Sequence, residues 1–185
     1  EYYAYETTFY SNVLMPEAIS IVDVNTGKYT AKRKIVNSET EAPLIIDDMT
    51  YDPKTDRIFG VHYDTDKNVS DIYEIDRTTL EIRRVATTSK LLFTLSADNG
   101  FLYSVRMTAR NCALCKIDES SIDENSLTCD IKDVSPASGT GVSMGNYSQS
   151  MEFDKTNHRL WWLAQTSDGN AYLVELDPNS GTAIN

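Results

Sequence analysis

Hydrophobic residues in this chain gather in short segments that are separated by polar, turn-prone stretches, and no segment shows the 3.6-residue periodicity of an amphipathic helix. Four of these segments end on a β-branched or leucine residue followed by an aspartate. The four aspartates are Asp23, Asp76, Asp118 and Asp177. Because aspartate side chains accept hydrogen bonds from the backbone of tight turns, we expect each one to start a hairpin turn.

A second repeat precedes the aspartate phrase. Residues 49–59 match residues 151–161 position for position, with an apolar residue, an aromatic residue, aspartate, a four-residue turn, arginine and an apolar–aromatic pair. A tighter version at 95–103 contains Asn99-Gly100, a dipeptide that favours the two-residue turn of a β-hairpin. Each copy therefore predicts a strand, a turn and a second strand.

Joined together, the two repeats predict four-stranded antiparallel units at residues 1–36, 44–86, 91–134 and 149–185, of which the first lacks its opening strand. Consecutive units of roughly forty to fifty residues are typical of a β-propeller. We therefore predict an all-β fold, a single β-propeller domain or propeller fragment with about four blades in this chain. A longer propeller is favoured over a closed ring of four, since an open array leaves bare β-edges that further blades from the parent chain would cover.

Three segments carry a resemblance to known repeats, at 49–61 (MTYDPKTDRIFGV), 70–82 (SDIYEIDRTTLEI) and 172–181 (YLVELDPNSG). They resemble the blades of secreted YVTN-like and NHL-like propellers, and are most similar to propeller lipoproteins on the surface of Bacteroidetes-type bacteria. The Gly-His…Trp-Asp signature of WD40 blades and the Ser-x-Asp-x-Gly-x-Thr-Trp box of sialidases are absent from the sequence. The resemblance implies a propeller fold and only loosely a function.

Charge and composition narrow the choice of partners. With a net charge of −11 the chain is a poor match for nucleic acid or an anionic membrane, because a phosphate backbone needs a basic surface. No apolar run approaches the length of a membrane span, so membrane insertion of this segment is not expected. The chain opens at Glu1 without a signal peptide, and we interpret it as a mature or trimmed product with an extracytoplasmic location.

The connections at one end of the predicted blades, residues 11–17, 38–43, 63–70 and 136–148, are the more irregular ones, and loops on a rigid scaffold commonly carry recognition. Aligning the first strands makes 47–48, 93–94 and 149–150 equivalent and places them along a central channel. A polar pocket, a cation site or a solvated strand end would each suit these side chains. The candidate ligand-binding residues are Asp47, Asp48, Tyr63, Asp64, Thr94, Tyr147, Gln149 and Ser150.

Three further motifs resemble metal, redox or phosphate-binding sites, but structural interpretations are favoured for them. Residues 64–70 imitate a calcium loop but lack its glycine and its final glutamate, which favours a polar hairpin loop. Cys112 and Cys115 fall on one predicted strand and point to opposite faces, so buried thiols are favoured over a redox or zinc site, and a disulfide between Cys115 and Cys129 stays open. The glycine-rich stretch at 139–145 lacks the lysine of a phosphate-binding loop. No catalytic residue, metal or cofactor is assigned.

The leading hypothesis is a non-enzymatic extracytoplasmic binding or adhesion module whose ligand is a glycan or a protein. The alternative is a propeller hydrolase or lyase of lactonase or glycosidase type, with Asp47 and Asp48 as a carboxylate or metal site in the channel. A purely structural domain of a larger surface protein is the third possibility.

Overall fold

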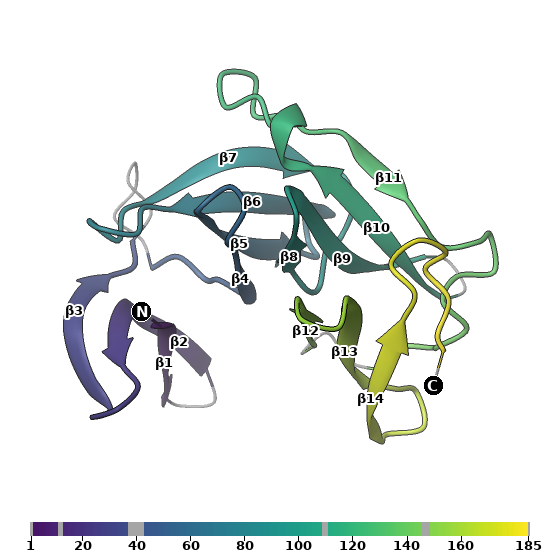
Figure 1. Cartoon of the computed structure of the whole chain (residues 1–185), viewed down its shortest axis with the longest axis horizontal. Helices are drawn as coiled ribbons and strands as arrows, with labels where there is room; N and C mark the ends of the chain where they lie inside the picture. The colour runs from purple at the N-terminus through teal and green to yellow at the C-terminus, as the bar shows by residue number, and fades with distance from the viewer. Residues whose placement is uncertain (1, 11–12, 37–42, 109–110, 146–148, 185) are drawn as a thin grey trace.

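The computed structural model describes residues 2–10, 13–36, 43–108, 111–145 and 149–184. In these ranges the protein is all-β, with four antiparallel sheets and one short 3₁₀ turn, η1 (Glu119–Ser121). Figure 1 shows the sheets following one another around an arc in chain order, with the N-terminal sheet in purple at one end and the C-terminal sheet in green to yellow at the other. The predicted β-propeller architecture is confirmed.

Each sheet is a meander of consecutive hairpins. Sheet 1 contains β1 (Tyr2–Tyr10), β2 (Val13–Asp23) and β3 (Lys28–Lys34). Sheet 2 contains β4 (Asp48–Asp52), β5 (Arg57–Asp64), β6 (Val69–Ile75) and β7 (Ile82–Thr88). Sheet 3 contains β8 (Ser96–Asp98), β9 (Phe101–Met107), β10 (Cys112–Asp118) and β11 (Ile131–Asp133). Sheet 4 contains β12 (Ser150–Asp154), β13 (Arg159–Gln165) and β14 (Ala171–Leu176), with residues 182–184 hydrogen-bonded alongside β14.

The four repeated aspartates start turns, as the sequence predicts. The carboxylate of Asp23 accepts a hydrogen bond from the N–H of Asn25, and Asp76 accepts from Thr78 and Thr79. Asp118 and Asp177 accept in the same way from the residue two positions ahead. These bonds lower the pKa of all four carboxyls, because they stabilise the charged form.

Turn geometry also explains the second repeat. Asn99 and Gly100 both have positive φ angles, at 58° and 85°, as a type I′ hairpin requires. Asp56 and His158 occupy matching places in the longer turns and also have positive φ angles, at 59° and 53°. The same local conformation therefore recurs in three sheets.

Two connections differ from the prediction. β5 and β6 extend toward each other and leave only residues 65–68 between them, and β2 begins at Val13 instead of after residue 17. Both segments continue strand pairing: Asp64 pairs with Val69, and residues 13–16 pair with β1. The first strand of sheet 2 begins at Asp48, later than the predicted residue 44.

The hydrophobic core is divided into three layers, each between two consecutive sheets. Ile19 and Ile35 of the first unit pack against Ile58 and Tyr73 of sheet 2. The second layer joins sheets 2 and 3, and the third joins sheets 3 and 4 around Trp162. Cys112 and Cys115 contribute to these layers as free thiols, and burial raises the pKa of Cys112 to about 11.

Polar side chains join the innermost strands. Along β4, Asp48, Thr50 and Asp52 point to the same side, since alternate residues of a strand share a face. Their oxygens accept hydrogen bonds from backbone N–H groups on or beside β8, the innermost strand of sheet 3. The pairs are Asp48 with Leu95 at 2.8 Å, Thr50 with Ala97 at 2.9 Å and Asp52 with Gly100.

We expect Thr50→Val to lower the free energy of unfolding by about 1–3 kcal/mol, because it leaves the buried N–H of Ala97 without its acceptor while keeping the side-chain shape. Urea denaturation measures this loss. Thr30→Val is the matched control: its hydroxyl bonds the carbonyl of Ile21 at an exposed position, so the change is expected to stay within about 0.5 kcal/mol. Equal effects of the two substitutions would contradict the role of Thr50.

Candidate functional site

Asp48 lies where β4, β8 and β12 meet. Its Oδ2 accepts hydrogen bonds from the N–H of Leu95 at 2.8 Å and from the N–H of Met151 at 3.3 Å. Its Oδ1 accepts from the N–H of Met49 at 3.0 Å and from the hydroxyl of Ser150 at 3.4 Å. One carboxylate thus connects the innermost strands of three sheets.

Burial raises the pKa of Asp48 to about 7. The three backbone N–H groups act in the opposite direction, because they stabilise the carboxylate, and the nearby charge of Glu152 raises the pKa further. Burial also raises the pKa of Glu119 to about 7, although the hydroxyl of Thr55 donates to its carboxylate. Two carboxyls of the sheet junctions therefore change protonation near neutral pH.

Asp47 makes a separate set of contacts. Its Oδ2 accepts a hydrogen bond from the N–H of Tyr63 at 3.0 Å and lies 2.8 Å from Nδ1 of His62. His62 is not among the residues predicted from the sequence, although hairpin register indicates its position. Asp48 pairs with Val61, and this register brings His62 beside Asp47.

Gln149 and Thr94 hold the hairpins of their own sheets together. Oε1 of Gln149 accepts from the N–H of Gln165 at 3.1 Å and from Nε1 of Trp162 at 3.0 Å. Thr94 is fully buried, and its hydroxyl accepts from the N–H of Val105 at 2.9 Å. Register makes Gln149 the counterpart of Asp47.

The remaining predicted residues lie apart from Asp48 or outside the described part. The ring of Tyr63 meets that of Phe93 edge-on, with centroids 5.0 Å apart. Asp64 accepts from the N–H groups of Asp66 and Lys67 and pairs with the ammonium of Lys67, as in a polar hairpin loop. Tyr147 lies outside the described residues. Within the described ranges, no group of three or more His, Cys, Asp or Glu side chains is placed to hold a metal ion.

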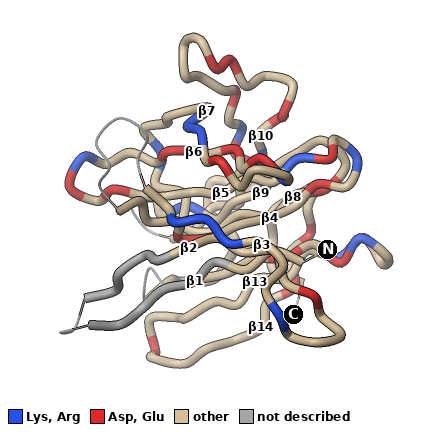
Figure 2. Tube along the Cα trace, turned by 90° about the vertical axis from the view of Figure 1, so that its left-hand side faces the viewer, with Lys and Arg blue, Asp and Glu red and all other residues tan. Residues whose placement is uncertain are grey.

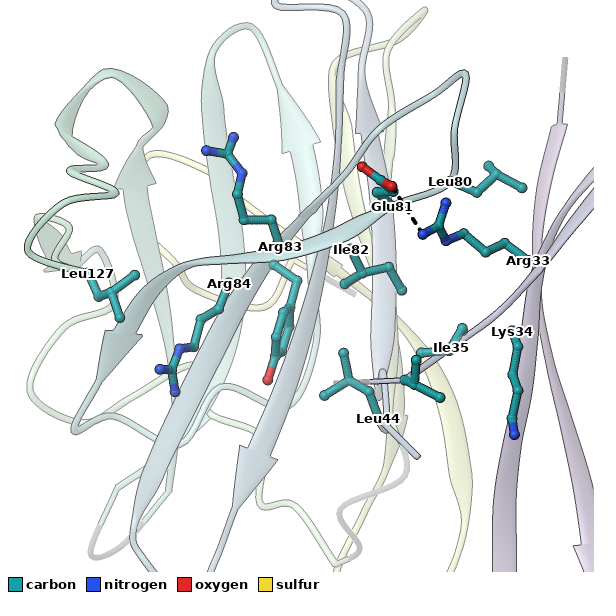
Figure 3. A pocket seen from close by; sticks show the side chains of 12 residues that line it. Arg33, Lys34, Ile35, Leu44, Leu80, Glu81, Ile82, Arg83, Arg84 and Leu127 are labelled. Carbon is teal, nitrogen blue, oxygen red and sulfur yellow. Dashed lines mark hydrogen bonds and ion pairs between the residues drawn. The ribbon is translucent and has the colours of Figure 1, made fainter. Parts of the chain in front are cut away.

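A groove of about 520 Å³ separates β3 from β7, the outermost strands of sheets 1 and 2. Figure 3 shows its apolar floor and its charged rim, which come from both sheets and from the segments beside them. The floor consists of Ile35, Leu44, Tyr73, Leu80 and Ile82. The rim carries Arg33, Lys34, Arg83 and Arg84, with Glu81 among them.

These cations stand out in a chain with a net charge of −11. Figure 2 shows the basic run of β3 as a continuous blue stretch. Arg33 is paired with Glu81 at 3.1 Å, and Arg83 is paired with Glu74 at 3.2 Å and with Glu124. Arg84 lies 3.7 Å from Asp71, the longest of these pairs.

A polar row connects the groove with the Asp47–His62 pair. Asp71 is the cross-strand neighbour of His62, which places both side chains on one face of sheet 2. Asp71 also accepts from the hydroxyl of Thr87 and faces Arg84. Recognition in this region can therefore use an apolar floor, cations at the rim and hydrogen-bonding groups along one side.

Comparison with solved structures supports the fold. No protein-family model matches the chain, and no curated protein matches it. Among solved structures, the chain is similar to a luciferin-regenerating enzyme, with a TM-score of 0.55 and 14% identity over 92% of this chain and 56% of that one. It is also similar to TolB from Acinetobacter baumannii, with a TM-score of 0.56 and 14% identity over 90% of this chain and 36% of that one.

The chain thus spans about half the length of the first of these proteins and about a third of the second. At this identity the similarity shows the β-propeller fold alone. Among the residues that the structure describes, no helix is long and apolar enough to cross a membrane.

We expect the wild-type protein to become less stable as the pH rises from about 4.5 to 7.5. The folded-state pKa of Asp48, about 7, exceeds its ordinary value of 3.8, so folding takes up a proton in this range. The stability from Asp48 is fully present below pH 3.8 and is lost as the pH rises through 7. One such group contributes a slope of at most about 1.4 kcal/mol per pH unit.

Asp48→Asn removes this titration, so its unfolding free energy should depend less steeply on pH over the same interval, while Glu119 keeps part of the slope. Urea denaturation at several pH values measures both slopes. Ser150→Ala is the control, because it removes only the 3.4 Å contact and leaves the carboxyl in place. If the unfolding free energy of Asp48→Asn depends on pH as steeply as that of the wild type, the pH dependence does not arise from Asp48.

Proposed function

We propose that this protein is a non-enzymatic binding module on a β-propeller scaffold, and that its ligand binds in the groove between β3 and β7. The observation that carries the proposal is the groove itself, with an apolar floor and four basic residues at its rim in an otherwise acidic chain. Cations arranged around an apolar surface select ligands that carry both negative charge and apolar surface. An acidic glycan or an acidic protein segment has this chemistry.

The proposal includes an extracytoplasmic site of action. The resemblance of the repeats to secreted YVTN-like and NHL-like surface propellers supports this location. A surface lipoprotein with an adhesive role would present the groove to glycans or proteins outside the cell. Fractionation of the producing cells, with the protein found in the cytoplasm, would overturn this part of the proposal.

We expect the double substitution Lys34→Ala and Arg84→Ala to weaken ligand binding by tenfold or more, since a charge-assisted hydrogen bond contributes about 1.5–3 kcal/mol. A glycan array that includes uronic and sulfated sugars, together with an acidic peptide array, identifies the ligand for titration. Binding should also weaken as salt is added.

The matched control is Lys28→Ala with Lys32→Ala, which removes the same net charge from exposed positions of β3 outside the groove. It should leave affinity nearly unchanged. If both pairs weaken binding equally, the protein attracts its ligand by overall charge and the groove is not the binding site. If no ligand binds on either array while small substrates are turned over, the binding proposal fails.

A hydrolase or lyase of lactonase or glycosidase type is the second candidate, and one observation favours it. Nδ1 of His62 lies 2.8 Å from the carboxylate of Asp47, an arrangement that can orient an imidazole as a general base. Turnover of lactones or glycosides that is lost in His62→Ala would support this candidate. Activity that persists when Asp47 and Asp48 are both replaced with alanine would exclude the version based on these carboxylates.

A further inference from the structure

Sheet 4 has one face packed against sheet 3 and one face that is exposed. The packed face includes Leu160 and Trp162, both fully buried. The other face presents Leu163 and Leu173, which are 52% and 62% exposed and are direct cross-strand neighbours. Large apolar side chains that lie together and face solvent usually mark a contact surface.

Register shows what the corresponding residues do in the two preceding sheets. Val61 and Ile72 form the same cross-strand pair in sheet 2, and Val105 and Leu114 form it in sheet 3. All four side chains are fully buried because the next sheet covers them. The exposed pair in sheet 4 therefore occupies positions that this chain uses for packing one sheet on the next.

The contacts of the arginine beside this pair, with an aromatic ring and with a glutamate, are also repeated. In sheet 2, Arg57 lies over the ring of Phe59 at 4.6 Å and pairs with Glu74. In sheet 4, Arg159 lies over the ring of Trp161 at 4.5 Å and pairs with Glu175. Phe59 is fully buried at the interface with sheet 3, whereas Trp161 is only partly buried.

The inner edge of sheet 4 carries acceptors in the matching places. Ser150 and Glu152 correspond by register to Asp48 and Thr50, whose oxygens accept backbone N–H groups from the first strand of the next sheet. Ser150 and Glu152 are both exposed. An added strand at this edge would find acceptors for its N–H groups.

From these equivalences we propose that the face formed by Trp161, Leu163 and Leu173 docks a further antiparallel blade of the same polypeptide. The occupant presents an apolar sheet face to the leucines and the backbone N–H groups of its innermost strand to Ser150 and Glu152. The same polypeptide is chosen as its source because each of the three core layers joins sheets that are consecutive in the chain. This inference does not depend on the proposed ligand groove.

Thiol protection tests the proposal in the natural gene product. Leu163→Cys and Leu173→Cys are made in a Cys129→Ser background, since Cys112 and Cys115 are buried. Val24→Cys is the control, because Val24 is 56% exposed and directly follows β2 of sheet 1, the sheet at the opposite end of the arc (Figure 1). Each variant is prepared as residues 1–185 and as the complete natural polypeptide, and labelling with a maleimide is followed over time.

In residues 1–185 all three cysteines should react at similar rates. In the complete polypeptide Leu163→Cys and Leu173→Cys should react at least tenfold more slowly, while the rate for Val24→Cys stays the same. Equal reactivity of Leu163→Cys in both forms would overturn the proposal. It would also be overturned if the gene encodes no further repeat, or if protection arises in residues 1–185 as the protein concentration rises, because the occupant would then be a second copy.

Discussion

The arrangement of the sheets depends on how the backbone N–H groups of the innermost strands are satisfied. β8 is bonded to β9 along one edge, and its other edge faces the neighbouring sheet instead of another strand. Asp48, Thr50 and Asp52 of β4 supply acceptors along this edge. A buried N–H without an acceptor costs more than its bond contributes when it is made, so these contacts restrict how β4 and β8 can lie relative to each other.

The alternation of side chains along a strand explains why two adjacent carboxylates have different roles. Consecutive residues of an extended chain point to opposite faces, so Asp48 reaches the junction of three sheets while Asp47 contacts His62. One face of sheet 2 packs against sheet 3. The other packs against the first unit through Ile58 and Tyr73, and it also carries His62 and Asp71, which lead toward the groove.

Much of the fold could be predicted because its signals are local. The turn aspartates and the Asn99-Gly100 hairpin act within a few residues, and the repeats they delimit identify the four sheets. The groove could not be predicted in this way, because its floor and rim are assembled from strands of two sheets whose packing depends on side chains distant in sequence. The Asp47–His62 contact is an intermediate case, since it follows from hairpin register, which the turn fixes once the strand ends are known.

The basic residues of β3 have two physical explanations that differ in what they require. Charged side chains on an outermost strand prevent it from pairing with other chains, and any exposed position on the strand serves this purpose. Lys28 and Lys32 need no other explanation. Lys34 and Arg84 line the groove from two different strands beside an apolar floor, an arrangement that edge protection alone does not call for. If the loss of ligand binding depends on which basic residue of β3 is replaced, the strand serves recognition and not only protection of a sheet edge.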